Sequence, residues 1–111
     1  MPRDDRLTLA QMQDAARRLS GLAREHGRAG FDEDDVVRLA MLHLIQRLGE
    51  AASRLSAEYR ATHAEFPWAE MIGLRNRIVH AYEDIDPEIV WHVASVDIEP
   101  VIAALDRALL P

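Results

Sequence analysis

The cluster of residues in this chain that is best suited to chemistry reads Met71-Ile72-Gly73-Leu74-Arg75-Asn76-Arg77-Ile78-Val79-His80-Ala81-Tyr82. On an ideal α-helix, where each residue turns by about 100°, the large apolar residues of this stretch gather on one side. Asn76 and His80 lie one turn apart on the opposite side, with Arg77 beside them. Gly73 on that polar side costs about 1 kcal/mol of helix stability, and we expect it to let another backbone approach closely. A bundle that buries the apolar side would present Asn76, Arg77 and His80 outward, and we call these three residues the polar row.

The composition is that of one helical globular domain spanning residues 1–111. Apolar residues make up 49% and charged residues 29% of the 111-residue chain, which is long enough to bury a core. Ala, Leu, Arg and Glu dominate, which favours helix over sheet. The first six residues are polar, and we expect them to be frayed.

Several classes of protein are disfavoured by simple counts. The chain has no cysteine, so it can form neither a disulfide nor a thiolate metal site. Its N-terminus does not resemble a signal peptide, and no apolar run approaches the roughly 18 residues of a membrane span. We therefore expect no membrane association and a cytoplasmic location.

The formal net charge of −6 argues against a general nucleic-acid coating protein, which usually carries a net basic field. It leaves room for a local basic cleft. All thirteen basic residues are arginine, whose planar guanidinium donates hydrogen bonds in pairs to phosphate. A genome that favours arginine codons explains the same bias.

The first half of the chain predicts two helices. Apolar residues recur at helical spacing over residues 7–26, and Gly27 and Gly30 should end that helix. Asp32 can cap a second helix that runs to Tyr59 or Thr62. Its apolar stripe is wide enough to face both a neighbouring helix and a second subunit.

The second half predicts two more helices. Pro67 suits the first turn of a third helix that carries the polar row to about Tyr82. Asp86-Pro87 is a cap and first turn for a fourth, which Pro100 should kink or split over residues 95–97. We therefore predict an all-α, up-and-down bundle of four main helices.

The stretch that carries the polar row also resembles a sequence motif of a known family. Arg75 to His80 fits the R-x4-H signature of HEPN domains, in which a polar residue follows the Arg. Other residues resemble the HepT branch of these domains: Pro67-Trp68, Gly73, Tyr82, Ile85-Asp86, Val90-Trp91 and Gly49-Glu50-Ala51-Ala52. R-x4-H alone is a weak signal, and the ordered set is much stronger.

The resemblance implies a HEPN-like, two-fold homodimeric toxin that acts as a metal-independent ribonuclease and needs no cofactor. It assigns Arg75 and His80 as the catalytic pair and Asn76 as the supporting polar residue. Its partner would be an MntA-like nucleotidyltransferase antitoxin, which silences the toxin by attaching AMP to Tyr82. The RNA target stays open, with transfer RNA as one candidate.

The same residue types suit RNA cleavage on chemical grounds. His can move protons near neutral pH, and Arg can stabilise a phosphorane-like transition state. One chain offers one such His on this face, whereas a two-fold dimer offers two. Arg77 is a candidate for binding RNA, and Arg47, one turn from His43 on the second helix, is another. No carboxylates and imidazoles repeat at metal-ligand spacing, so we expect no metal site.

Two observations leave other functions open. Arg75 and His80 are separated by about 140° on an ideal helix, so Arg75 must wrap round, reach across a dimer or sit on an irregular helix. The net charge of −6 suits a non-catalytic helical binding partner of a nucleotidyltransferase. In a plain dimerisation bundle, Arg75 and His80 would only brace helices.

Overall fold

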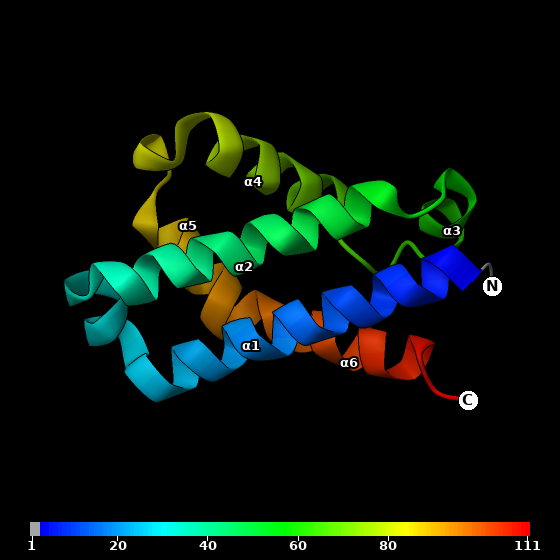
Figure 1. Ribbon diagram of the computed structural model, residues 1–111, viewed down its shortest axis with the longest axis horizontal. Coiled ribbons are helices and arrows are strands. Elements are labelled where there is room, and N and C mark those ends of the chain that lie inside the picture. The colour runs from blue at the N-terminus through cyan, green and yellow to red at the C-terminus, as the bar shows by residue number, and fades with distance from the viewer. Residues whose placement is uncertain (1–2) are drawn as a thin grey trace.

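The computed structural model describes residues 3–111, and all the secondary structure in that range is helical (Figure 1). The elements in order are α1 (Arg3–Glu33), α2 (Asp35–Arg54), α3 (Ala57–Thr62), α4 (Trp68–Ala81), the 3₁₀ turn η1 (Tyr82–Asp84), α5 (Pro87–His92), the π-helical η2 (Val93–Asp97) and α6 (Ile98–Ala108). The all-α prediction is confirmed. None of these helices combines the length and apolar character needed to cross a bilayer.

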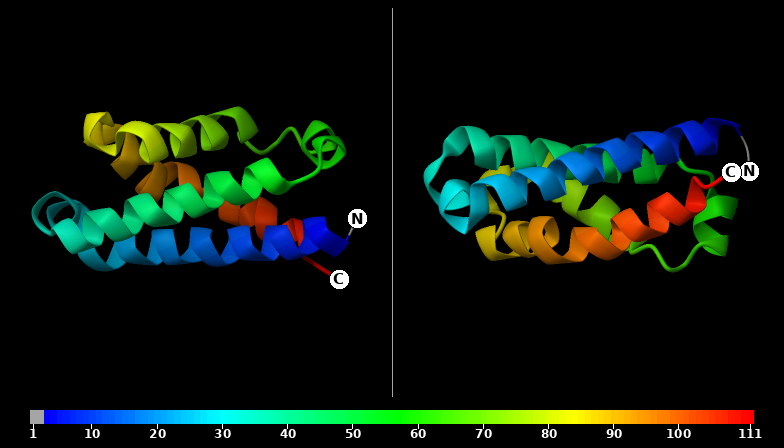
Figure 2. Two further views of the ribbon diagram at one scale, coloured as in Figure 1. Left: turned by 45° about the horizontal axis from the view of Figure 1, so that its top comes forward. Right: turned by 90° about the horizontal axis from the view of Figure 1, so that it is seen from below.

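Helix α2 is the central element of the fold. It packs against α1 on one side and α4 on the other (Figure 1). Helix α6 packs along α1, as the view from below in Figure 2 shows. The core between these helices is aliphatic, and its fully buried side chains include Leu9, Met12, Leu19, Met41 and Leu105.

The junction between α1 and α2 differs from the prediction. Gly27 has a positive φ of 65°, which glycine reaches without steric cost. It ends the straight part of α1 as predicted, but after the kink the chain continues as helix to Glu33 instead of opening a loop. Asp32 therefore belongs to α1 and binds Arg28 at 2.9 Å. Asp34 caps α2, because its Oδ1 accepts the Val36 N–H at 2.9 Å.

A buried carboxylate corrects two further expectations. Asp5 is 4% exposed and accepts hydrogen bonds from the Ser56 N–H at 3.1 Å and the Ser56 hydroxyl at 2.8 Å. Residues 3–6 are thus helical and anchored, not frayed; Met1 and Pro2 lie outside the described residues. Ser56 caps α3 through the Tyr59 N–H, so the second helix ends at Arg54 and not at Tyr59 or Thr62.

The last helical unit follows the prediction. Asp86 caps α5 by accepting the Glu88 N–H at 2.9 Å, and Pro87 occupies the first turn. The helix becomes π-helical over Val93–Asp97, where Pro100 was expected to disturb it. Pro100 has no N–H to offer the carbonyl four residues back, so the ladder widens there.

Helices α2 and α4 approach each other closely at Gly49 of α2. A Cβ on Gly49 would lie 2.2 Å from the Arg75 Cβ and 2.7 Å from the Met71 carbonyl oxygen of α4. The expectation of a close backbone approach at Gly73 is wrong within the protomer, because no atom of the described residues 3–111 would lie within 4 Å of a Cβ there. The glycine that permits close contact is therefore on α2.

The two glycines predict opposite effects of the same substitution. Gly49→Ala should lower the free energy of unfolding by about 1–3 kcal/mol, because the new methyl group overpacks the crossing. Gly73→Ala should raise it by about 1 kcal/mol through helix propensity alone. Urea unfolding of both variants measures the difference. An unchanged midpoint in Gly49→Ala would contradict the close crossing.

Candidate active site

Helix α4 presents the polar row outward, as its sequence pattern predicts. Leu74 and Ile78 are buried in the core, whereas Asn76, Arg77 and His80 are exposed. The aliphatic face of α4 therefore fixes the direction in which the polar side chains point.

Arg75 lies half-buried at the crossing of α2 and α4, opposite Gly49. Its Nη1 donates to Asn76 Oδ1 at 2.8 Å, and its Nη2 lies 3.8 Å from Glu50 Oε1. Its Nε is buried without a hydrogen-bond partner. Glu50 also accepts a hydrogen bond from Gln46 at 3.0 Å. The guanidinium is thus held between the two helices, with donor capacity left unused.

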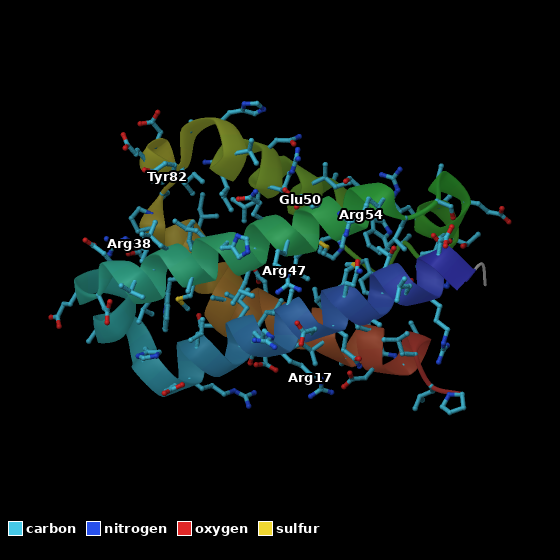
Figure 3. All side chains as sticks on the ribbon, in the orientation of Figure 1. Arg17, Arg38, Arg47, Glu50, Arg54 and Tyr82 are labelled. Atoms are coloured by element: carbon cyan, nitrogen blue, oxygen red, sulfur yellow. The ribbon has the colours of Figure 1, made fainter. Side chains whose placement is uncertain are left out.

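His80 and Tyr82 lie at the C-terminal end of α4 and the start of η1. His80 is exposed in the last turn, and Tyr82 opens η1 with 51% of its surface exposed. Tyr82 borders a groove of about 400 Å³ that is also lined by Arg38 and Leu39 of α2. Figure 3 shows Tyr82 near this end of α2 and well away from Glu50.

The structure joins only part of the predicted catalytic set. Arg75 and Asn76 are hydrogen-bonded to each other. Within residues 3–111, neither a hydrogen bond nor an ion pair links His80 to Arg75. Their angular separation of about 140° on α4 explains this, since the α-helix is regular between them.

The two arginines predicted to bind RNA do not share a surface in the protomer. Arg47 lies on α2, with Nη2 3.5 Å from Asp14 Oδ2 of α1. Arg77 borders a largely apolar groove of about 390 Å³ on another part of the surface. This groove runs between α4 and the continuous segment α5–η2–α6, beside Gly73 and Val101. Only Arg47 is on the side of α2 that leads to Glu50 and Arg75.

The groups at the site suit an anionic ligand. They are a guanidinium, an amide, an imidazole and a phenol, together with the carboxylate of Glu50. Paired guanidinium donors match phosphate geometry. Among the described residues, 3–111, no group of three or more His, Asp or Glu side chains could hold a metal ion.

Sequence analysis missed a polar hollow between α1 and α2. It has a volume of about 240 Å³ and is lined by Gln11, Arg47, Glu50, Ala51 and Arg54. Arg47 and Arg54 are seven residues apart on one helix, a spacing that puts both side chains on the same face, so the sequence contained a signal that these two arginines lie together. Gln11 gave none, because only the packing of α1 on α2 brings it there. Glu50, which lines the hollow, also lies 3.8 Å from Arg75 Nη2 of α4.

Comparison with known proteins places this chain in a family. The family model described as "Ribonuclease HepT-like" matches residues 12–108. The protein named "Probable ribonuclease HepT" from Thermococcus cleftensis is 26% identical over 98 residues, which cover 88% of this chain and 89% of that protein. Small helical proteins of the HEPN kind are therefore the class to which fold and site point. The chain belongs to the HepT-like ribonuclease family.

Two further relatives match over shorter stretches. A protein of Methanocaldococcus jannaschii named "Putative RNase" is 30% identical over 71 residues, 64% of this chain and 65% of that protein. Another "Putative RNase", from Caldanaerobacter subterraneus, is 33% identical over 61 residues, 55% of this chain and 54% of the relative. The match thus spans less than two thirds of these two relatives. No solved structure matches the chain significantly.

Proposed function

We propose that this protein is a metal-independent endoribonuclease that acts as the toxin of a toxin–antitoxin pair in the cytoplasm. The observation that carries the proposal is the half-buried Arg75, paired with Asn76 and followed on α4 by an exposed His80, in a chain of the HepT-like ribonuclease family. These residues supply the functions that RNA cleavage requires.

The reaction uses the nucleophile that RNA carries itself. A base removes the proton of the 2′-OH, the 2′-oxygen attacks phosphorus, and the 5′-oxygen leaves with a proton from an acid. His80 serves in proton transfer, because the ring nitrogens of an imidazole can both accept and donate a proton. Arg75 stabilises the added negative charge on the non-bridging oxygens with paired donors. Its contact of 3.8 Å to Glu50 is longer than a hydrogen bond, so a phosphate can replace it.

A homodimer completes the site. One protomer has a single His80 on this face and does not link it to Arg75, whereas a two-fold pair brings two of each together. The surface beside the site is apolar enough for such contact. Val36 is 76% and Leu39 53% exposed on α2, and Val79 is 44% exposed on α4. The proposed dimer buries these side chains and sets the two motifs in one cleft.

Control by an antitoxin acts at Tyr82. The phenol oxygen attacks the α-phosphorus of ATP, pyrophosphate leaves, and the phenolic proton passes to the enzyme's base or water. The enzyme is an MntA-like nucleotidyltransferase. The exposure of Tyr82 supports its access to that partner. A negatively charged adenylyl group two residues from His80 would repel the RNA backbone.

A second candidate is a non-catalytic helical partner of a nucleotidyltransferase. The separation of Arg75 from His80 within the protomer and the net charge of −6 favour it. This candidate also binds the antitoxin, so complex formation does not discriminate between the two. Cleavage by the isolated protein does.

Removal of the imidazole should abolish cleavage. His80→Ala should lower kcat by about 10²–10⁴, as expected for loss of a general acid or base. The assay follows a labelled RNA pool in the presence of EDTA. His92→Ala is the matched control, because His92 is also exposed but lies on α5, where it contacts Asp97. Full activity in His80→Ala, with an unchanged circular dichroism spectrum, would exclude the proposed catalysis.

Charge in the apolar contact should split the dimer. Leu39→Glu should shift the protein toward monomer in sedimentation velocity and reduce cleavage in parallel. Leu7→Glu is the control, since the exposure of Leu7 (60%) is similar to that of Leu39 (53%) but Leu7 lies on α1. A Leu39→Glu variant that stays dimeric would show that the subunits meet elsewhere.

AMP transfer should depend on one of the two tyrosines. Co-production with the nucleotidyltransferase should add one or more AMP units to the intact mass, and Tyr82→Phe should remove that gain. Tyr59→Phe should retain it, because Tyr59 is 6% exposed. A gain that survives in Tyr82→Phe would move the modification to another residue.

A further inference from the structure

We propose that the hollow between α1 and α2 binds a phosphodiester group of the RNA next to the one at Arg75. Gln11, Arg47 and Arg54 are its binding residues. This inference rests on the proposed ribonuclease function and adds a second contact with the substrate backbone.

The hollow is small and polar. Its volume is about 240 Å³, and the small side chain of Ala51 forms part of its wall. Arg54 Nη2 donates to Gln11 Oε1 at 3.1 Å, which leaves the Gln11 amide nitrogen as a donor. Figure 3 shows Arg47, Glu50 and Arg54 along the same stretch of α2. Three side chains from two helices thus offer donors to one anion.

Few acidic side chains neutralise the positive charges of Arg47 and Arg54, so both guanidinium groups can interact with an anionic ligand. Arg54 forms no ion pair within residues 3–111; its contact is the neutral Gln11. Arg47 reaches Asp14 only at 3.5 Å, whereas Arg18 donates to the same carboxylate at 3.0 and 3.1 Å. The hydrogen bond from Arg18 is the main cause of the lowered pKa of Asp14, and the bond from Arg47 contributes less.

The hollow adjoins the candidate active site. Glu50 lines the hollow and also lies 3.8 Å from Arg75 Nη2. When the scissile phosphate of an RNA strand binds Arg75, the neighbouring phosphate of the same strand therefore lies at the hollow. The Glu50 carboxylate opposes a phosphate in the hollow, so the donors of Gln11, Arg47 and Arg54 must outweigh its repulsion.

The chemistry of the hollow favours the RNA backbone over the bases. None of its lining residues is aromatic, so the hollow has no aromatic platform for base stacking. Guanidinium and amide donors reach phosphate and sugar oxygens, which position nucleic acid without reading its sequence. We therefore expect the contact to be independent of sequence.

The test measures binding in a background that cannot cleave. A fluorescent single-stranded RNA is titrated into His80→Ala at several salt concentrations, with and without Arg54→Ala. The second substitution should weaken binding about tenfold and reduce the slope of log K against log salt by about 0.7, the value for one lost phosphate contact in a single strand. Arg54→Lys should recover part of the affinity.

Arg17→Ala is the matched control. Arg17 is an exposed arginine on α1, paired with Asp106 of α6 at 2.7 Å, and its loss should leave the slope unchanged. Equal affinities and slopes for Arg54→Ala and Arg17→Ala would overturn the proposal. Inorganic phosphate that binds as tightly as the RNA, and is lost in Arg54→Ala, would overturn the RNA assignment.

Cleavage assays distinguish failure of the phosphate-binding hollow from failure of the proposed ribonuclease function. In an active enzyme, Arg54→Ala should raise KM with little change in kcat, and an unchanged KM would overturn the subsite alone. If the wild-type protein cleaves no RNA, but Arg54→Ala still weakens RNA binding in the His80→Ala background, the subsite stands and the ribonuclease proposal fails.

Discussion

The contact between Gly49 and the backbone of α4 is the constraint on which the site depends. A Cβ at position 49 would clash with α4, since it would lie 2.2 Å from the Arg75 Cβ and 2.7 Å from the Met71 carbonyl oxygen. Only glycine, which has no Cβ, fits there. The contact brings α4 close against α2, so that Arg75 is half-buried and Glu50 comes within 3.8 Å of its guanidinium. A wider crossing would leave Arg75 a flexible surface side chain. Its ordering before substrate arrives lowers the entropy lost in binding phosphate.

The same crossing turns one edge of the bundle into a continuous polar strip. The strip runs from Gln11 on α1, over Arg54 and Glu50 on α2, to Arg75 and Asn76 on α4. Each of the three helices contributes side chains that its own sequence pattern leaves outside the core. The anchoring of α1 by Asp5 and Ser56 fixes the helix that carries Gln11 against the end of α2. Packing of the core therefore also aligns the polar groups.

The parts that sequence predicted correctly are governed by local chemistry. The start of α4 after Pro67, the cap at Asp86 and the disturbance before Pro100 depend on neighbouring residues alone, and so does the outward polar side of α4. Two of the errors involve partners distant in sequence: Ser56 for Asp5, and Gly49 in place of Gly73 as the point of close approach between helices. The cap at Asp34 in place of Asp32 follows from the bend at Gly27. The R-x4-H motif predicts residues of the site but not their arrangement, which depends on the helix crossing and, in our proposal, on a second subunit.

In the proposed function, RNA approaches an edge of this acidic protein that lies away from the acidic residues of η1. The acidic residues Glu83 and Asp84 lie in η1, beyond the end of α4, whereas Arg54 lies at the end of α2 near the start of α4 (Figure 3). The 14 residues of α4 separate these ends by about 21 Å at 1.5 Å per residue. The Debye length at physiological salt is about 8 Å, so the acidic end is largely screened from the strip. The local charge of the arginines, and not the net charge of −6, therefore governs the approach of an RNA backbone to this edge. Screening also weakens long-range attraction, which leaves the short-range guanidinium contacts at Arg54, Arg47 and Arg75 to determine affinity.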